Sequence, residues 1–509
     1  MMSQPLESYV DFRQFRRSVA LFRGAIGFMS GMFLFLFGPI VHNALINAQS
    51  VVANGAAVMK PGDFMPGGYD PLRWTAIMFA VGIFSEFLLE IPTGLFADIL
   101  GRKRAIVSSM IFRFINLGLM FLLIVLGKGP SPRTVIAIVF VYWIFYSLFF
   151  TLQNGAYEAW VKSFLEEKKR PEDQALVFAW GENWYNALFL IGAIIGVFLW
   201  SYDLPHLAYL AGMGVSILCA CICWLYLPEN RKRDLTGDAQ PRQKRSKVFR
   251  QKWIEVFRNS LSEVKNGRLM VVFLVNAAVT SLTYLINLSL FIFFKNHFPE
   301  FFVVKADAVV ALNSWGWSVL TTFALAFTTL VGNLVFSRWL RRRLQAKKGV
   351  GVWTLVSINT IFNLCLAIPV LVASLIFGKE DAATGRSFLL LLIVLMVVHK
   401  LAASTYRVAV MTLQNDLIPS GKKETATILS LGATIKNLVI IFLIVVGVGK
   451  EPATLWAWKW PAIVVLAATA AMLACVREKA RGGVEPAENN FIPVPPVSSV
   501  VSTAVPKAE

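Results

Sequence analysis

Two glutamates lie four residues apart in a stretch that is otherwise apolar, and an aspartate follows them. Glu86 and Glu90 share one face if the stretch is helical, and at 1.5 Å per residue they lie roughly 18 and 12 Å from Asp98 along the axis. Carboxylates at that depth are costly unless they face a wet cavity or a partner. They are therefore candidates for loading and releasing protons, and the alternative is a structural ion pair with Arg113 on the next apolar stretch.

Basic and amide side chains occupy apolar stretches in the second half of the chain. Lys400, Arg407 and Gln414 lie on one stripe at helical spacing, with Tyr406 on the adjoining flank. Two interpretations stay open: the bases pair with the acids across a cavity, or they bind an anionic or zwitterionic solute, which we favour. The residues expected to line such a cavity are Asn186, Asn276, Tyr284, Lys400, Tyr406, Arg407, Gln414 and Lys436.

The composition indicates that these residues belong to a membrane protein. Of 509 residues, 56% are hydrophobic and only 16% are charged, a smaller charged share than soluble domains carry. Apolar runs of bilayer-crossing length recur along the whole chain, and the first is too long for a signal peptide. They predict about twelve membrane spans, at 20–48, 74–97, 105–127, 134–165, 174–201, 206–227, 269–297, 307–337, 352–378, 387–418, 424–448 and 455–475.

The positions of Lys and Arg predict the orientation, because these residues gather in every second loop. Examples are Arg102–Arg104, Lys168–Arg170 and Lys422–Lys423. Basic loops favour the cytoplasmic side, so both termini are expected there. The net charge of +19 is spread over alternate loops, which favours topology and anionic lipid headgroups as its explanation over a nucleic-acid partner.

A long polar segment divides the predicted spans into six and six. We expect an N-terminal six-helix bundle at 1–227, a basic cytoplasmic linker at 228–268, a C-terminal six-helix bundle at 269–475 and a disordered cytoplasmic tail at 476–509. The tetrapeptide TLQN occurs at 151–154 and again at 412–415, in the fourth span of each half. This placement supports a parallel repeat of the two halves.

The loop after the second span carries a signature. Its sequence, GLFADILGRKRAI, resembles the loop between the second and third helices of the major facilitator superfamily, with Ile99 where a basic residue is usual. The matching residues are Gly94, Asp98, Gly101, Arg102 and Lys103. The resemblance extends to the helix count and to the segments EIPTG and NGAYEAW. It implies an all-α membrane protein with twelve transmembrane helices in two pseudo-repeated six-helix bundles.

The resemblance also implies a function. A chain similar to this superfamily is expected to be a secondary transporter that moves a small solute across the cytoplasmic membrane by alternating access. Asp98 would latch the inner gate by facing the start of the span near Glu424, and Arg113 and Glu158 would belong to a gate network. Our hypothesis is that Glu86, together with Glu90, couples transport to protons.

Two departures from the resemblance keep alternatives open. Thr151 stands where proton-linked members often carry an Arg, and the antiporter signature of helix five is reduced to GAIIG, Gly192 to Gly196, which is typical of close helix packing. Proton-independent uniport and efflux of drugs or siderophores are the alternative functions. A non-transporting receptor of the same fold is disfavoured, because it would not need ionisable residues inside the spans.

An intramembrane enzyme is disfavoured by the scarcity of catalytic groups. The chain has 4 His, which form no paired motif, and no phosphate-binding Walker loop. Cys219, Cys221 and Cys223 point in alternating directions on a helix and cannot converge on a metal. We expect no enzymatic activity, no cofactor and no metal site, and a monomer whose partners are a small-molecule substrate, protons and membrane lipids.

Overall fold

The structure is a computed structural model. It describes residues 4–34, 40, 41, 44, 71–127, 131–202, 204–227, 251, 254–262, 267–297, 327, 330–332, 334–340, 342, 352–377, 406–418, 424–448 and 459–481. The helices are α1 Gln4–Leu34, α3 Pro71–Leu100, α4 Arg102–Leu126, α5 Pro132–Glu167, α6 Gln174–Ser201, α7 Pro205–Tyr226, α9 Gly267–His297, α11 Val352–Phe377, α13 Thr425–Val448 and α14 Lys459–Arg481, with a 3-10 turn at Pro171–Asp173. The described residues contain no strand, as an all-α fold requires.

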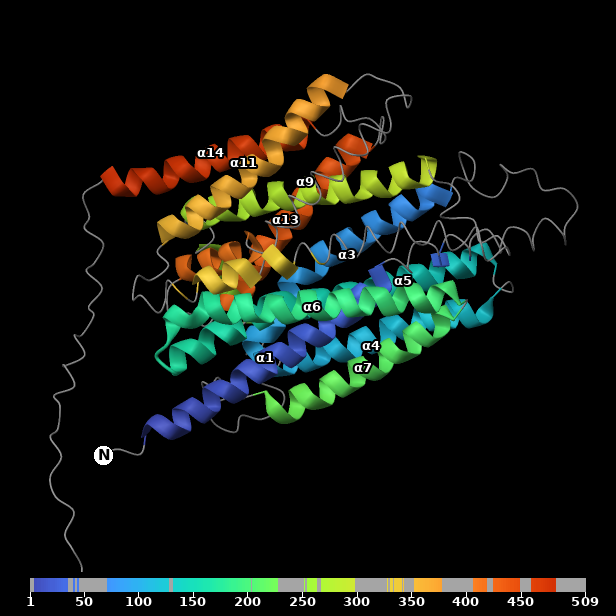
Figure 1. Cartoon of the computed structure of the whole chain (residues 1–509), viewed down its shortest axis with the longest axis horizontal. Helices are drawn as coiled ribbons and strands as arrows, with labels where there is room; N and C mark the ends of the chain where they lie inside the picture. Colours follow the sequence, from blue (N-terminus) through green and yellow to red (C-terminus); the bar gives the residue numbers. More distant parts are fainter. Residues whose placement is uncertain are drawn as a thin grey trace, which may run out of the picture.

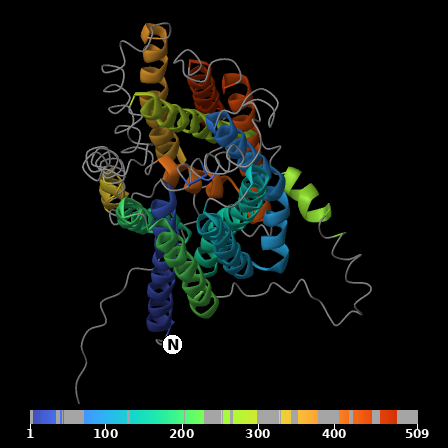
Figure 2. The same ribbon diagram turned by 90° about the vertical axis from the view of Figure 1, so that its right-hand side faces the viewer.

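The helices form two groups that lie side by side. In the first, α1 packs on α6 and α7, α4 packs on α5 and α7, and α3 packs on α5. In the second, α9 contacts α13 and α14, and α11 contacts α14. Figure 1 shows most of the first group in blue to green below the second group in yellow-green to red, with α3 between them, and in Figure 2 α3 again lies next to the helices of the second group. The groups meet where α13 packs against α3 and α5.

The described helices follow the predicted spans, with corrections at the chain ends. The first span was predicted at 20–48, and Ile40, Val41 and Ala44 within it are helical, but α1, Gln4–Leu34, already begins at Gln4. Its charged first half stays helical because Phe15 packs on α5, with its ring centroid 3.8 Å from that of Phe164. The last helix continues to Arg481, so the first residues of the predicted tail are helical. Of the spans at 307–337 and 387–418, the structure describes only parts, including helical segments at 334–340 and 406–417.

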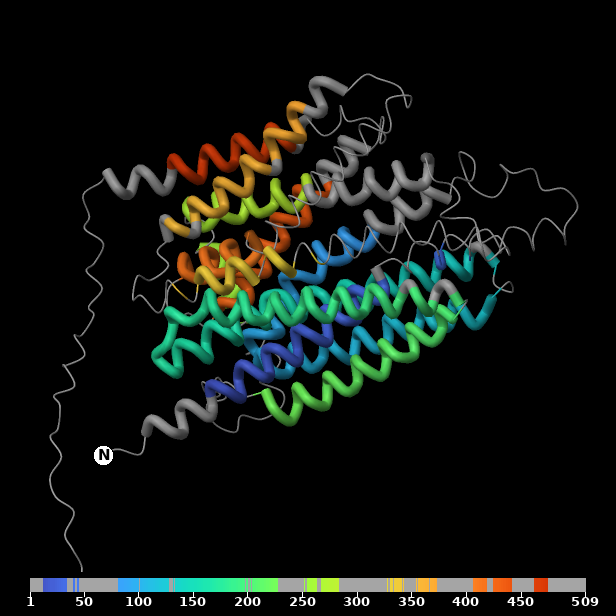
Figure 3. Tube along the Cα trace, viewed as in Figure 1, coloured from blue at the N-terminus to red at the C-terminus, as the bar shows by residue number. Residues whose placement is uncertain are grey.

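Three of the described helices are long and apolar enough to cross a membrane by length and composition, at Arg102–Leu126, Arg133–Glu167 and Pro205–Tyr226. All of them belong to the first group, whose course is easily followed in the Cα trace of Figure 3.

Glycines let α1 and α6 pack with their backbones in contact. A Cβ atom added at Gly192 would overlap the carbonyl oxygen of Phe28, and one added at Gly196 would overlap that of Met32. The reverse holds on α1, where a Cβ at Gly31 would overlap the carbonyl oxygen of Phe189. The GAIIG segment is therefore a small-residue packing motif, as the sequence analysis interpreted it.

We expect Gly192→Ala to destabilise the protein by about 1–3 kcal/mol, because overpacking a tight contact forces the two backbones apart. The measurement is SDS-induced unfolding of the purified protein in mixed micelles. Gly214→Ala is the matched control, since Gly214 lies in α7 and nothing lies within 4 Å of a Cβ built there. Equal stability of the two variants would contradict the packing role of Gly192.

Candidate functional site

A buried ion pair links the two helix groups through Glu182 of α6. The guanidinium of Arg23, on α1, donates to the Glu182 carboxylate, and both residues are buried, with 1% and 3% exposed. Arg407, in the helical segment 406–417, lies 3.5 Å from the same carboxylate. Glu182 thus holds one base from each half of the chain.

Aromatic rings enclose this ion pair. The Arg23 guanidinium lies over the ring of Tyr185 at 4.7 Å and over that of Tyr157 at 5.4 Å. The Arg407 guanidinium lies 5.8 Å from the centroid of the Tyr185 ring, and its side chain is 40% exposed. The faces of such rings attract guanidinium groups, which stabilises the charged form of the buried Arg23.

Three more carboxylates surround Lys436 of α13. Lys436 interacts electrostatically with Glu86 and Glu90 of α3 and with Glu158 of α5. Glu158 also interacts electrostatically with Arg407 and Arg23, so we treat the two parts as one charge cluster. We define this cluster as the four acids Glu86, Glu90, Glu158 and Glu182 with the three bases Arg23, Arg407 and Lys436.

One acid of the charge cluster stands apart from the rest. Glu90 has no exposed surface, and neither of its carboxylate oxygens has a hydrogen-bond partner at hydrogen-bonding distance and angle among the described residues. Its polar neighbours include Asn154 and Lys436. Since an unpaired buried charge is expensive, Glu90 is the acid of the cluster whose charge is least compensated by hydrogen bonds.

Asp98 caps the beginning of α13 from the other helix group. Its carboxylate accepts hydrogen bonds from the backbone N–H groups of Ala426 (3.3 Å) and Thr427 (2.8 Å) and from the Thr427 hydroxyl (2.8 Å). A carboxylate at a helix N-terminus satisfies N–H groups that have no partner inside the helix. The structure places Asp98 at the start of the span near Glu424, which is the contact that the sequence analysis expected.

The glycines near Asp98 allow this contact. A Cβ at Gly94 would lie 2.6 Å from the Ser430 hydroxyl oxygen, and one at Gly155 would lie 2.8 Å from the Ala426 carbonyl oxygen, so α13 fits closely between α3 and α5. Gly101 has a φ of 108°, which a residue with a side chain rarely adopts, and it makes the turn into α4.

The remaining residues of the signature loop bind within the first helix group. Arg102 donates to the Ala159 carbonyl oxygen at 2.7 Å and to the Ser163 hydroxyl, and it lies 3.4 Å from Asp98. Lys103 lies over the Trp224 ring at 5.8 Å. The loop is therefore fixed to α5 and α7, which holds Asp98 in position.

The expected gate network of Arg113 and Glu158 is not formed in this structure. Arg113 donates to Asn116 on its own helix at 3.1 Å, and its guanidinium lies over the ring of Phe149 at 5.0 Å. Arg113 lies on the face of α4 that packs against these aromatic rings. It therefore pairs neither with Glu158 nor with the glutamates of α3. The base that faces Glu86 and Glu90 is Lys436 instead.

Lys162 forms a second contact between the halves that the sequence analysis missed. Its spacing from Glu158 predicts an i,i+4 pair on α5, but its ammonium donates to the backbone carbonyls of Asn415 and Ile418, both at 2.7 Å. These carbonyls end the helical segment 406–417, where a cation is favourable. Asp98 and Lys162 thus cap one helix start and one helix end of the second group.

We expect Lys162→Met to weaken the contact between α5 and the end of the segment 406–417 by about 1–2 kcal/mol, since the carbonyls of Asn415 and Ile418 lose a buried cation. Spin labels at positions 167 and 424 would report a larger share of long distances by pulsed EPR. Lys169→Met is the control, because Lys169 is exposed in the turn that follows α5. Distance distributions that are identical in both variants would exclude a latch role for Lys162.

The expected cavity residues are only partly brought together. Asn186 is buried on α6, and its amide nitrogen has no hydrogen-bond partner among the described residues. Tyr406 donates to Asn276 at 3.4 Å, which joins α9 to the segment 406–417. Gln414 is buried. Lys400 lies outside the described residues, and the side chain of Tyr284 on α9 does too.

Comparisons with known proteins agree with this architecture. Residues 23–443 match the family model described as Major Facilitator Superfamily. The structure is similar to that of the human organic anion transporter MFSD10 (TETRAN), with a TM-score of 0.58, 13% identity, and coverage of 92% of this chain and 100% of that one. A search of curated protein sequences found no match.

Two structures of a bacterial homologue of the iron transporter ferroportin are also similar. The one in the outward-facing state with soaked iron has a TM-score of 0.57 and 14% identity, and covers 92% of this chain and 99% of that one. The one in the outward-facing state has a TM-score of 0.57 and 13% identity, with coverages of 92% and 100%. At these identities the similarity shows the fold alone.

Proposed function

This chain belongs to the major facilitator superfamily of transporters, and from that premise we propose that it is a proton-coupled secondary transporter of a small anionic or zwitterionic solute. The observation that carries the proposal is the charge cluster, in which the acids outnumber the bases by one and the buried Glu90 carboxylate has no partner at hydrogen-bonding distance and angle among the described residues. The cluster joins α1, α3, α5 and α6 to α13 and the segment 406–417, so opening one side must pull its charges apart.

Proton binding at Glu90, next to Glu86, would neutralise the excess carboxylate. With the proton bound, the closed cluster is balanced in charge, and the two halves can rearrange without an unpaired acid in an apolar environment. Release of the proton on the other side would restore the excess charge and favour opening. This sequence is the basis of coupling in an alternating-access cycle.

The contact of Arg407 supports an anionic or zwitterionic substrate. Arg407 is the base from the second half that reaches Glu182, and a solute carboxylate or phosphate could replace Glu182 as its partner when the halves separate. A zwitterion would engage Glu182 as well. Asn186, whose amide nitrogen has no hydrogen-bond partner among the described residues, is a further donor on the same helix.

The contacts of Asp98 and Lys162 would close the side that carries the basic loops. We infer that this side is cytoplasmic, that the chain spans a cytoplasmic membrane with both termini inside, and that these contacts latch its inner gate. Their loosening would open the cavity inward.

The test is uptake of labelled solutes into proteoliposomes under an imposed pH gradient. A panel of organic anions, amino acids, sugars, drugs and siderophore-like chelates would be compared with and without the gradient. We expect an anion or amino acid to accumulate only when the gradient is present. Uptake of a solute at the same rate without the gradient would favour the alternative, proton-independent uniport.

A further inference from the structure

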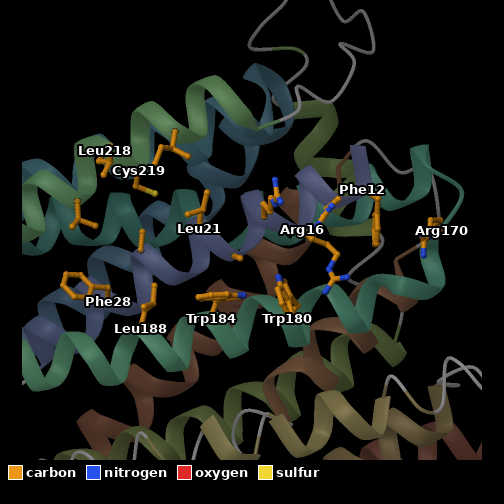
Figure 4. A pocket seen from close by; sticks show the side chains of 16 residues that line it. Phe12, Arg16, Leu21, Phe28, Arg170, Trp180, Trp184, Leu188, Leu218 and Cys219 are labelled. Atoms are coloured by element: carbon orange, nitrogen blue, oxygen red, sulfur yellow. The ribbon is translucent and has the colours of Figure 1, made fainter. Parts of the chain in front are cut away.

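A groove runs along α1 between α6 and α7, away from the charge cluster. Its volume is about 1030 Å³. The α6 residues in it, Trp180, Trp184 and Leu188, follow each other at intervals of four and therefore lie on a different face of that helix from Glu182. Figure 4 shows α1 crossing between the other two helices with these side chains along it. The groove is thus a site separate from the one proposed for the solute.

The residues of α1 that line the groove change from basic to apolar along the helix. Arg13, Arg17, Leu21, Ala25 and Phe28 all line it, at intervals of three or four residues, so they form one stripe. The stripe is basic for its first two members and apolar for the rest. From Arg17 to Phe28 it rises about 16 Å, close to the thickness of one hydrocarbon leaflet, about 15 Å.

The apolar part of the groove is open on its outer side. Leu21 is 53% exposed and Leu218, on α7, is 61% exposed. Trp184 is exposed to 40% on the opposite wall. In Figure 4 these three residues and Leu188 lie between the basic end and Phe28. An extended hydrocarbon chain could lie there in contact with all three helices.

Guanidinium groups border the other end of the groove. Arg13 and Arg17 are exposed. Arg16 lies over the Trp180 ring at 4.6 Å, and Arg170 lies over the Phe12 ring at 4.2 Å and pairs with Asp173. The rings hold two of the guanidiniums at the mouth, where Arg13 and Arg17 present two more.

We propose that this groove binds an anionic phospholipid of the leaflet next to the basic loops. Arg13 and Arg17 hold its phosphate, and one acyl chain lies along Leu21, Ala25 and Phe28. Guanidinium forks match phosphate oxygens in charge and geometry. The acyl chain adds no preference between lipids, because neighbouring lipid is as apolar as the groove, so selectivity resides in the headgroup.

The test uses the full-length protein in detergent and phospholipids with brominated acyl chains, which quench nearby tryptophans. Trp184 faces the acyl part of the groove, so the quenching that is lost in Trp184→Phe reports lipid at this site. We expect phosphatidylglycerol to quench Trp184 at a lower concentration than phosphatidylcholine. Each arginine near an anionic lipid contributes about fivefold, so the preference is about 25-fold for Arg13 and Arg17 together.

The double variant Arg13→Gln/Arg17→Gln should remove this preference and leave phosphatidylcholine quenching unchanged. Its matched control is Arg104→Gln/Lys169→Gln, which removes the same charge from exposed positions on the same side but outside the groove. Equal quenching by the two lipids in the wild type would overturn the proposal. Equal losses in the two double variants would overturn it as well, since attraction would then come from overall charge.

Discussion

Glu90→Gln is expected to abolish solute accumulation driven by a pH gradient while leaving solute exchange intact. Glutamine keeps the volume and polarity of Glu90 but cannot carry the proton, so the charge cluster stays balanced at every step. Transport should then run without coupling. We expect accumulation in proteoliposomes to fall at least tenfold, to the level reached without a gradient, and counterflow of labelled against unlabelled solute to stay within about twofold of wild type.

Glu167→Gln is the matched control for this variant, because Glu167 is exposed at the end of α5. It should behave as wild type in both assays. Glu86→Gln tests the second acid on the same face of α3: it also leaves three acids against three bases, so we expect accumulation driven by the pH gradient to fall as it does in Glu90→Gln. The coupling role of Glu90 is excluded if Glu90→Gln still accumulates solute against its gradient.

The second large effect is expected at Glu182, where truncation leaves two guanidiniums without their carboxylate. Breaking a buried ion pair by removing one partner costs about 3–5 kcal/mol, and we expect a loss of this size in Glu182→Ala. Arg23 bears most of it, since only 1% of its surface reaches solvent and it lies between aromatic rings. SDS-induced unfolding in mixed micelles measures the change.

A double variant separates the loss of the ion pair from general damage to α6. Arg23→Met combined with Glu182→Leu removes both charges and keeps apolar volume, so this variant should recover most of the stability lost in Glu182→Ala. Glu172→Ala, at an exposed site, should change stability by less than about 0.5 kcal/mol. A double variant as unstable as Glu182→Ala would show that the charges of the pair are not the cause.

The helices, the contact of Asp98 and the buried face of Glu86 and Glu90 could be predicted from the sequence, because all of them depend on local patterns. Apolar runs mark most helices within a few residues. The loop signature pointed to the contact of Asp98 with the start of α13, and the spacing of Glu86 and Glu90 placed them on one buried face. These features need only the rise of a helix and the cost of a buried charge.

The partners of the charges could not be predicted in the same way, because they depend on how helices rotate against one another. Arg23 and Glu182 are 159 residues apart, and no local pattern joins them. Each could have been found as an ionisable residue inside a predicted span, the same argument that singled out Glu86. Arg113 satisfies that argument too, yet it faces aromatic rings and lies outside the cluster.

Lys162 shows a similar limit. Its spacing from Glu158 predicts a pair on one helix, but the carbonyls at the end of the segment 406–417 lie within 2.7 Å and offer two acceptors at once. A helix end presents several carbonyls without partners, whereas Glu158, the neighbour of Lys162 at i−4, interacts with the bases of the charge cluster instead. Only the packing of the two halves brings that helix end to Lys162.

The most direct test of coupling is the pH inside proteoliposomes that start with equal pH on both sides. Once a transported solute is known, a solute gradient alone would be imposed and the internal pH followed with a trapped dye. We predict a pH change that depends on the solute, grows with its gradient and is absent in Glu90→Gln. Solute entry at an unchanged internal pH in the wild type would contradict the account, because the excess carboxylate would then carry no proton.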